Sequence, residues 1–344
     1  MQYYNLTKSL SISRLILGTW QFVDNHASSC ADYTSILSAY INAGVSTITT
    51  ANIYPGVEAK IGDYLKSQRS DHASGELIKP QIMTIFTAMP NQLHDFTEED
   101  ILAAVDGALE RLQIEKIDLI QFFCWAMPDK IAIKVGRALT KAVELGKIAA
   151  LGAVNMSTNT LEALINEGIH IVSNQVPYSI LDRRAESKMM PFCQKHDIAL
   201  LTYGTLCGGF LSEKYLGQSQ AADNLSLQKY QATIDAIGGW DVFQSVLERL
   251  CDLASSLNVS VSQLVSAYVL EQPMVASIIL GAHNTKHLES SLAILDIKLS
   301  KDNIEKINAI ISELKAMPGD IYESEIEREL TTGRLKPFVS YYKE

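Results

Sequence analysis

The chain has 344 residues, of which 47% are hydrophobic and 20% are charged. This composition supplies a large apolar core and argues against an intrinsically disordered chain. The formal net charge is -10, and the sequence contains no run of basic residues. Nucleic acid and anionic lipid are therefore not expected as main partners, because both need clustered Lys and Arg.

The cysteines also restrict the class of protein. There are five, an odd number, and none forms a Cys-x-x-Cys pair: Cys30, Cys124, Cys193, Cys207 and Cys251. A disulfide framework and a structural zinc site are not expected, and a reducing cytosol fits best. The first residues contain no apolar core of a signal peptide, and no stretch approaches the roughly 20 apolar residues of a membrane span. We expect a cytoplasmic protein with no metal and no membrane partner.

Short apolar runs alternate with amphipathic stretches along the chain. The runs cover residues 15–18, 46–50, 81–87, 116–123, 147–154, 169–175, 198–204 and 275–281. Between them, EEDILAAVDGALERLQI at 98–114 repeats apolar residues in three- and four-residue steps, which indicates a helix. Apolar strands separated by helices are typical of parallel sheets. Eight such units predict a closed (β/α)8 TIM barrel.

Three segments depart from this alternation. We expect an N-terminal β-hairpin before the first barrel strand. Residues 208–240 form a long polar insertion after the seventh strand, and a tail from about Leu299 begins with a further helix, KDNIEKINAIISELK. Long loops at the carboxyl ends of barrel strands tend to build the pocket and its lid. None of these segments resembles a separate domain, so residues 1–344 are predicted to form a single domain.

Several segments, in this order, carry a family resemblance. They are LILGTWQF, TTANIYPGVEAKIGDYL, ERLQIEKIDLIQF, GKIAALGAVNMS, SNQVPYSILDRR, LLTYGTLCGGFLSEKYLG and SIILGAHNTKHLESSLAIL. Together they resemble the aldo-keto reductase family over nearly the whole chain. The resemblance implies the barrel fold, NADPH as the cofactor for reducing carbonyls, and a tetrad of Asp, Tyr, Lys and His at the top of the barrel.

The resemblance leaves most of that tetrad unmatched. In the family the Tyr protonates the developing alkoxide, the Lys and Asp lower its pKa, and the His orients the carbonyl. Tyr54 matches the Tyr, but Thr49 stands for the Asp, Ala88 for the Lys and Phe123 for the His. A phenol of pKa about 10 is a poor acid without a nearby cation. We therefore expect Tyr54 to keep a pKa near 10 and to act only as a hydrogen-bond donor.

The resemblance also assigns cofactor contacts. They fall on Asn155, Gln175, Tyr203, Leu206, Gly208, Gly281, His283 and His287. In the family the first two hold the nicotinamide amide and the aromatic residue stacks on the nicotinamide ring. Arg, the usual partner of a 2′-phosphate, is replaced by His283, and Val154 replaces a Ser. NADP(H) binding with weakened affinity is the expectation.

The ends of the first and fourth strands predict the substrate pocket. Trp20, Tyr54, Phe123, Cys124 and Trp125 would give it an apolar, aromatic wall, whereas the alternative is plain core filling.

Other residues receive simpler interpretations. Cys124 and Cys207 have no His or Lys partner in the sequence and are expected to be inert buried thiols. Glu58 is interpreted as structural, and Asp182 with Arg183 as a local ion pair or cap. His26 and His94 lie in loops near the top of the barrel, where each could enter the site or face solvent.

Three hypotheses for the function follow. The first is an enzyme that converts a largely apolar metabolite without redox chemistry, by cyclisation, dehydration or isomerisation. The second is a diverged NADPH-dependent reductase of an unusual carbonyl or activated acceptor. The third is a non-catalytic protein that binds NADP(H) or another small ligand. In each case we expect a small-molecule partner and a monomer or homodimer.

Overall fold

Eight parallel strands form the closed barrel that the alternating pattern predicted. The structure, a computed structural model, describes residues 1–24, 32–68, 78–88, 97–124, 129–220, 225–321 and 323. In barrel order the strands are β3 (Leu15–Gly18), β4 (Thr47–Ala51), β5 (Gln81–Ala88), β6 (Ile117–Cys124), β7 (Ile148–Val154), β8 (Ser173–Pro177), β9 (Ala199–Tyr203) and β10 (Val275–Gly281). β10 pairs with β3, with Gly281 opposite Gly18, and this pairing closes the sheet.

The sixth barrel strand differs from its predicted position. The sequence predicted it at 169–175, but β8 begins at Ser173. Ile169 and Ile171 are buried in the connection that precedes the strand. Buried loop residues give the same apolar run as a buried strand, so periodicity alone could not separate the two.

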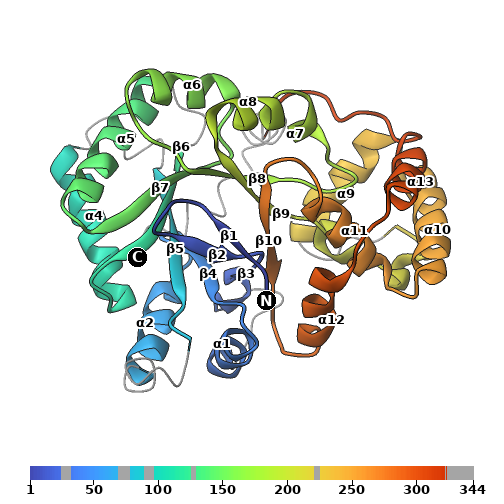
Figure 1. The fold of residues 1–344 in the computed structure, drawn as a ribbon, viewed down its shortest axis with the longest axis horizontal. Coiled ribbons are helices and arrows are strands. Elements are labelled where there is room, and N and C mark those ends of the chain that lie inside the picture. The colour runs from blue at the N-terminus through green and yellow to red at the C-terminus, as the bar shows by residue number, and fades with distance from the viewer. Residues whose placement is uncertain are drawn as a thin grey trace.

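Helices surround the barrel (Figure 1). They are α1 (Tyr33–Asn42), α2 (Val57–Ser67), α4 (Glu98–Leu112), α5 (Asp129–Glu144), α6 (Thr158–Asn166), α7 (Arg184–Ser187), α8 (Met189–His196), α9 (Leu225–Ile237), α10 (Trp240–Ser256), α11 (Val261–Leu270), α12 (Leu288–Leu292) and α13 (Lys301–Ile311). Short 3-10 turns lie at η1 (Trp20–Phe22), η2 (Cys207–Gly209), η3 (Glu213–Tyr215) and η4 (Ala293–Asp296).

α4 shows how local sequence and packing agree. Thr97 and Asp100 form a capping box at its start, which satisfies two backbone donors of the first turn. Ile101, Val105 and Leu112 are buried and recur at helical spacing, so one face of α4 packs on the barrel.

The predicted N-terminal hairpin closes one end of the barrel. β1 (Tyr3–Asn5) pairs antiparallel with β2 (Ser11–Ser13). Leu10 and Ile12 pack in one cluster with Ile16, Met83 and Leu119 from the barrel strands. In Figure 1 the hairpin, in dark blue, lies across the middle of the barrel. The amino end is therefore sealed, and the opposite end remains for a site.

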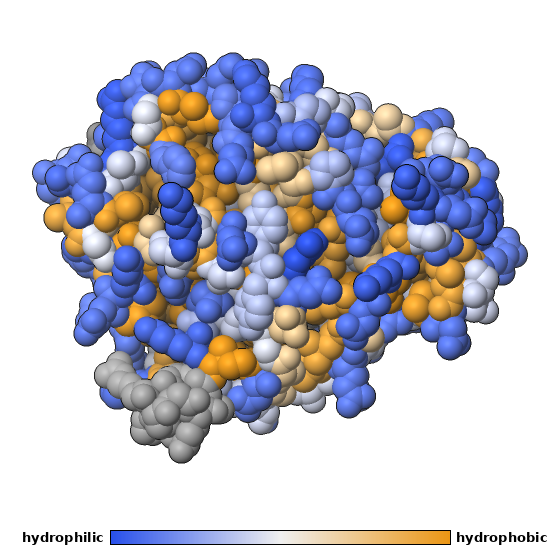
Figure 2. All heavy atoms as spheres, in the orientation of Figure 1, coloured by the Kyte–Doolittle hydropathy of each residue, from blue (hydrophilic) through white to orange (hydrophobic). Residues whose placement is uncertain are grey.

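The insertion after the seventh strand is partly helical. It contains η2, η3 and α9, while the expected C-terminal helix is α13, which ends at Ile311. On the face drawn in Figure 2, hydrophilic residues cover much of the periphery, with hydrophobic residues showing between them. In the part of the chain that is described, no single helix is long and apolar enough to cross a membrane. Only α10 and α11 taken together have that length and composition, and they are bent by 89° relative to each other.

Candidate active site

Tyr54 lies where the chain leaves β4, at the carboxyl end of the barrel. Its amide donates to the carbonyl of Ala51 at 3.0 Å, a turn that directs the chain into α2. Trp20, which follows β3 in η1, places its ring 4.8 Å from the Tyr54 ring in an edge-to-face arrangement. Such aromatic pairs are favourable beyond their buried area. The structure thus brings together two residues of the predicted pocket.

The surroundings of Tyr54 are apolar. Ala51, Ile85, Phe123 and Val154 form a buried cluster, and Tyr54 packs against it. Phe123, which the family resemblance aligns with the His of the tetrad, is only 6% exposed. An aromatic hydrocarbon therefore forms part of the wall beside Tyr54.

The expectation of a pKa near 10 for Tyr54 is wrong. Burial raises the pKa of the Tyr54 hydroxyl to about 12, and no charged group of the described residues opposes this shift. Burial disfavours the charged phenolate, and only a nearby cation could compensate. Tyr54 is thus a weaker acid than a free phenol, although its hydroxyl can still donate a hydrogen bond.

Two further tetrad positions hold no ionisable group. Thr49 is 5% exposed, and within the described residues its hydroxyl has no hydrogen-bond partner. Its backbone carbonyl accepts from the Thr19 hydroxyl at 3.0 Å, which ties β4 to the residue after β3. Ala88 ends β5 opposite Cys124 in the strand register. Thr49 is thus a buried residue in the middle of β4.

The thiols of Cys124 and Cys207 stay protonated at neutral pH. Burial raises the pKa of the Cys124 thiol to about 12 and that of the Cys207 thiol to about 12 as well. The Cys207 sulfur lies 3.3 Å from the Ser179 hydroxyl. Because thiolates are the reactive form, these pKa values favour the expectation that both thiols are inert. Trp125, His26, His94 and Cys30 lie outside the described residues.

The residues assigned to the nicotinamide amide lie on adjoining strands. The Tyr203 hydroxyl donates to Asn155 Oδ1 at 2.9 Å. Gln175 Oε1 accepts from Gln121 Nε2 at 2.9 Å in the barrel interior. Sequence reasoning missed Gln121, although it sits two residues before Phe123, on the same inward face of β6. Gln121 fixes the orientation of the Gln175 amide.

The loop after β9 is covered by the chain itself. A Cβ placed on Gly204 would lie 2.6 Å from the Tyr230 hydroxyl, and one on Gly208 would lie 2.9 Å from the Tyr230 ring. The Lys229 ammonium lies 5.1 Å from the centre of the Tyr203 ring. Lys229 and Tyr230 belong to α9, inside the insertion that the sequence analysis expected to help build the pocket or its lid. α9 therefore packs against the loop to which the family resemblance assigns cofactor contacts.

The adenosine-side residues are dispersed on the surface. His283 and His287 are both exposed, after β10 and at the start of α12. The Gln21 amide lies against Gly281, where an added Cβ would come within 2.3 Å of its nitrogen. Leu206 lies next to the fully enclosed Cys207 in the loop after β9.

The expected ion pair of Asp182 involves a different arginine. Arg184, not Arg183, donates to Asp182 through Nε at 2.8 Å and Nη2 at 2.6 Å. Arg184 lies two residues along the chain at the start of α7, which turns its side chain inward. Glu58 is structural, as predicted: it accepts from the Thr84 hydroxyl at 2.7 Å and from Arg111 Nε at 2.8 Å.

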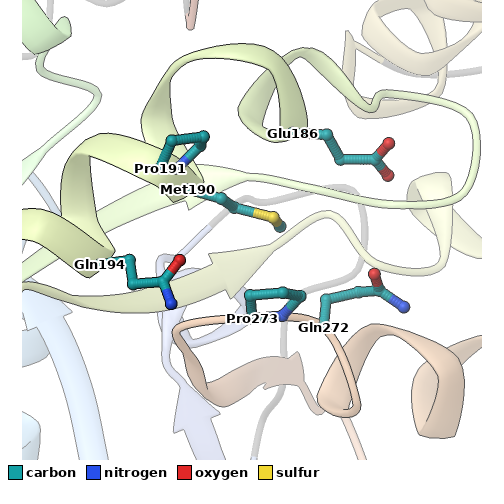
Figure 3. A pocket seen from close by; sticks show the side chains of 6 residues that line it. All are labelled: Glu186, Met190, Pro191, Gln194, Gln272 and Pro273. Carbon is teal, nitrogen blue, oxygen red and sulfur yellow. The ribbon is translucent and has the colours of Figure 1, made fainter.

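A groove on another part of the surface is separate from this site. It is lined by Glu186, Met190, Pro191, Gln194, Gln272 and Pro273 (Figure 3). Gln272 and Pro273 precede β10, whereas Tyr54 follows the carboxyl end of β4. Within the described ranges, no group of three or more His, Cys, Asp or Glu residues could hold a metal ion.

Comparison with known proteins identifies the family. The model of the Aldo/keto reductase family matches residues 14–312. Protein tas of Escherichia coli is 27% identical over 346 residues, covering 90% of this chain and 97% of that protein. Aldo-keto reductase YhdN of Bacillus subtilis is 24% identical over 326 residues, covering 92% and 96%.

Solved structures agree with this assignment. A thermostable aldo-keto reductase, Tm1743, superposes with a TM-score of 0.70 at 25% identity and covers 90% of this chain and 100% of its own. The glycerol dehydrogenase of Gluconobacter oxydans, with a TM-score of 0.74 at 22% identity and 91% and 95% coverage, shares the fold. The chain belongs to the aldo/keto reductase family.

Proposed function

We propose that this protein converts a largely apolar small metabolite at the carboxyl end of the barrel by a reaction that needs no hydride. Cyclisation, dehydration and isomerisation are the reaction types that fit. The observation that carries the proposal is the wall around Tyr54, where Trp20 and Phe123 stand and the pKa of the hydroxyl is raised to about 12. Such a pocket selects by shape and stacking rather than by charge.

The role of Tyr54 follows from its surroundings. In an apolar pocket its hydroxyl stays protonated at neutral pH and donates a hydrogen bond to an oxygen of the substrate. Trp20 holds the ring from its edge, which orients the hydroxyl. The enzyme would then accelerate the reaction mainly by holding one reactive conformation of the substrate and excluding water.

A product analysis tests this proposal. The purified protein is incubated with a panel of apolar carbonyl and hydroxyl compounds, with and without NADPH, and products are followed by mass spectrometry. Products of unchanged mass, or lighter by one water, that form without NADPH would support the proposal. Products that gain two hydrogens and form only with NADPH would overturn it.

The second candidate is a diverged NADP(H)-dependent oxidoreductase. The pairing of Tyr203 with Asn155, next to Gln175, favours it, since these residues are the ones assigned to the nicotinamide. Weakened cofactor affinity remains a prediction for this candidate. A protein that binds its ligand without turnover is the third candidate, and it would give tight binding with no product in the same panel.

A further inference from the structure

α9 lies on the part of the barrel that the family resemblance assigns to the cofactor. We propose that α9 is a built-in plug, in which Lys229 and Tyr230 occupy the place of a dinucleotide, so that NADP(H) binds only when this end of the helix is displaced. The inference goes beyond the proposed function, because a hydride-free reaction at Tyr54 is compatible with an open or a closed cofactor loop.

Tyr230 fills the cradle made by two glycines. Gly204 and Gly208 have φ angles of +72° and +69°, a conformation that favours glycine. A Cβ on Gly204 would lie 2.6 Å from the Tyr230 hydroxyl and one on Gly208 2.9 Å from its ring. Leu227, one turn earlier, would lie 3.2 Å from a Cβ on Gly208. The bare backbone that an extended anionic ligand would approach is therefore already in contact with α9.

Lys229 places a positive charge beside the assigned nicotinamide partner. Its ammonium lies 5.1 Å from the centre of the Tyr203 ring and 5.8 Å from that of Tyr230. Cation–π contacts of this kind are attractive, and more so when water is excluded. The nicotinamide ring is positively charged in NADP⁺ and neutral in NADPH. At this end of the site, Lys229 should therefore disfavour the NADP⁺ ring relative to the NADPH ring.

The two ends of α9 are held differently. Ile234 and Ile237 are fully buried, and the carbonyl of Ile237 accepts from the Lys315 amide at 2.9 Å. The first turns instead carry the partly exposed Leu227, Lys229 and Tyr230. The carboxyl half thus anchors the helix in the core, and the plug residues can leave the loop without exposing that anchor.

Cofactor titration of matched variants tests the plug. NADPH and NADP⁺ are titrated by calorimetry into the wild type, Lys229→Gln, Tyr230→Leu and the double variant. Lys214→Gln is the control, because Lys214 lies 5.0 Å from the Tyr215 ring in η3, away from Tyr203. Tyr230→Leu keeps an apolar side chain on α9, and circular dichroism checks that each variant is folded.

We expect the double variant to bind NADPH at least tenfold more tightly than the wild type, with Lys214→Gln unchanged. Lys229→Gln should improve NADP⁺ binding more than NADPH binding. Equal or weaker affinity in the double variant, or no binding in any variant, would overturn the plug. The proposed function is tested separately, by turnover without NADPH in the product analysis. A failed plug therefore does not contradict the proposed function, and a failed proposed function does not contradict the plug.

Discussion

At the scale of single residues, burial lowers the acidity of the Tyr54 hydroxyl. Tyr54 keeps the family's phenol, but Trp20 and Phe123 enclose it and its pKa is about 12. A proton donor works best when its pKa is near the working pH. Because burial raises this pKa, we expect the Tyr54 hydroxyl to act as a fixed hydrogen-bond donor rather than as an acid.

Tyr54→Phe tests this residue directly. The phenylalanine ring keeps the packing against Trp20 and removes only the hydroxyl, so we expect an unchanged melting temperature. Turnover of an active compound from the panel should fall about tenfold, the value of one neutral hydrogen bond. Rates and thermal unfolding are measured in parallel, with Tyr4→Phe at the opposite end of the barrel as the control. A loss of a thousandfold or more would instead identify Tyr54 as a general acid.

At the scale of elements, close backbone contact fixes how α2 lies against α4. A Cβ on Gly62 would come within 2.2 Å of the Arg111 carbonyl oxygen and 2.8 Å of the Leu112 carbonyl carbon. Neither backbone atom can move away without shifting a helix. The glycine is therefore required by packing, although glycine weakens a helix.

Gly62→Ala should lower the free energy of unfolding by roughly 1–3 kcal/mol, because it overpacks this contact. Gly107→Ala is the matched control in α4, since its Cβ would meet only the end of the flexible Arg111 side chain, at 3.0 Å. Gly107→Ala should be neutral or stabilise by up to about 1 kcal/mol through helix propensity. Urea unfolding of both variants checks the prediction, and equal effects would contradict it.

The carboxylate of Glu58 joins three elements. It lies on α2, is 3% exposed, and bonds Thr84 on β5 and Arg111 on α4. Glu58→Ala should destabilise the protein by about 1–3 kcal/mol, because it leaves the buried Thr84 hydroxyl without its acceptor.

Chemical denaturation measures this effect against Asp106→Ala. Asp106 forms an ion pair with Lys147, and its side chain is 54% exposed. The control should change stability by less than about 0.5 kcal/mol. Similar losses in the two variants would show that Glu58 does not join the elements.

At the scale of the whole molecule, buried acids determine stability at alkaline pH. Burial raises the pKa values of Tyr54, Cys124, Cys193 and Cys207 to about 12 each, from 10.0 for tyrosine and 9.0 for cysteine. The unfolded chain ionises these groups at lower pH than the folded chain. The unfolded state therefore binds fewer protons, and stability falls as pH rises from about 9 towards 12.

The free energy of unfolding, measured in urea at pH 8, 10 and 11, should be highest at pH 8 and fall at each step. Combining Tyr54→Phe with Cys124→Ala removes two of the ionising groups and should make this fall shallower. A stability that stays constant up to pH 11 would contradict the burial of these groups.

The sequence alone determined the architecture and the family. Eight apolar runs separated by amphipathic helices predict the barrel, because the spacing of apolar residues and the length of each run can be seen in a local stretch of sequence. The replacement of tetrad residues by Thr49, Ala88 and Phe123 stays a prediction, because it rests on the alignment of motifs in the sequence. The sixth strand was misplaced only because buried loop residues share the pattern of a buried strand.

Only the tertiary structure decided how distant segments meet. Two examples depend on packing across separate elements. Lys229 and Tyr230 approach the loop after β9, and Gln121 bonds to Gln175. The pKa of Tyr54 likewise depends on side chains from several strands. Such contacts are set by three-dimensional proximity, which no local period in the sequence records.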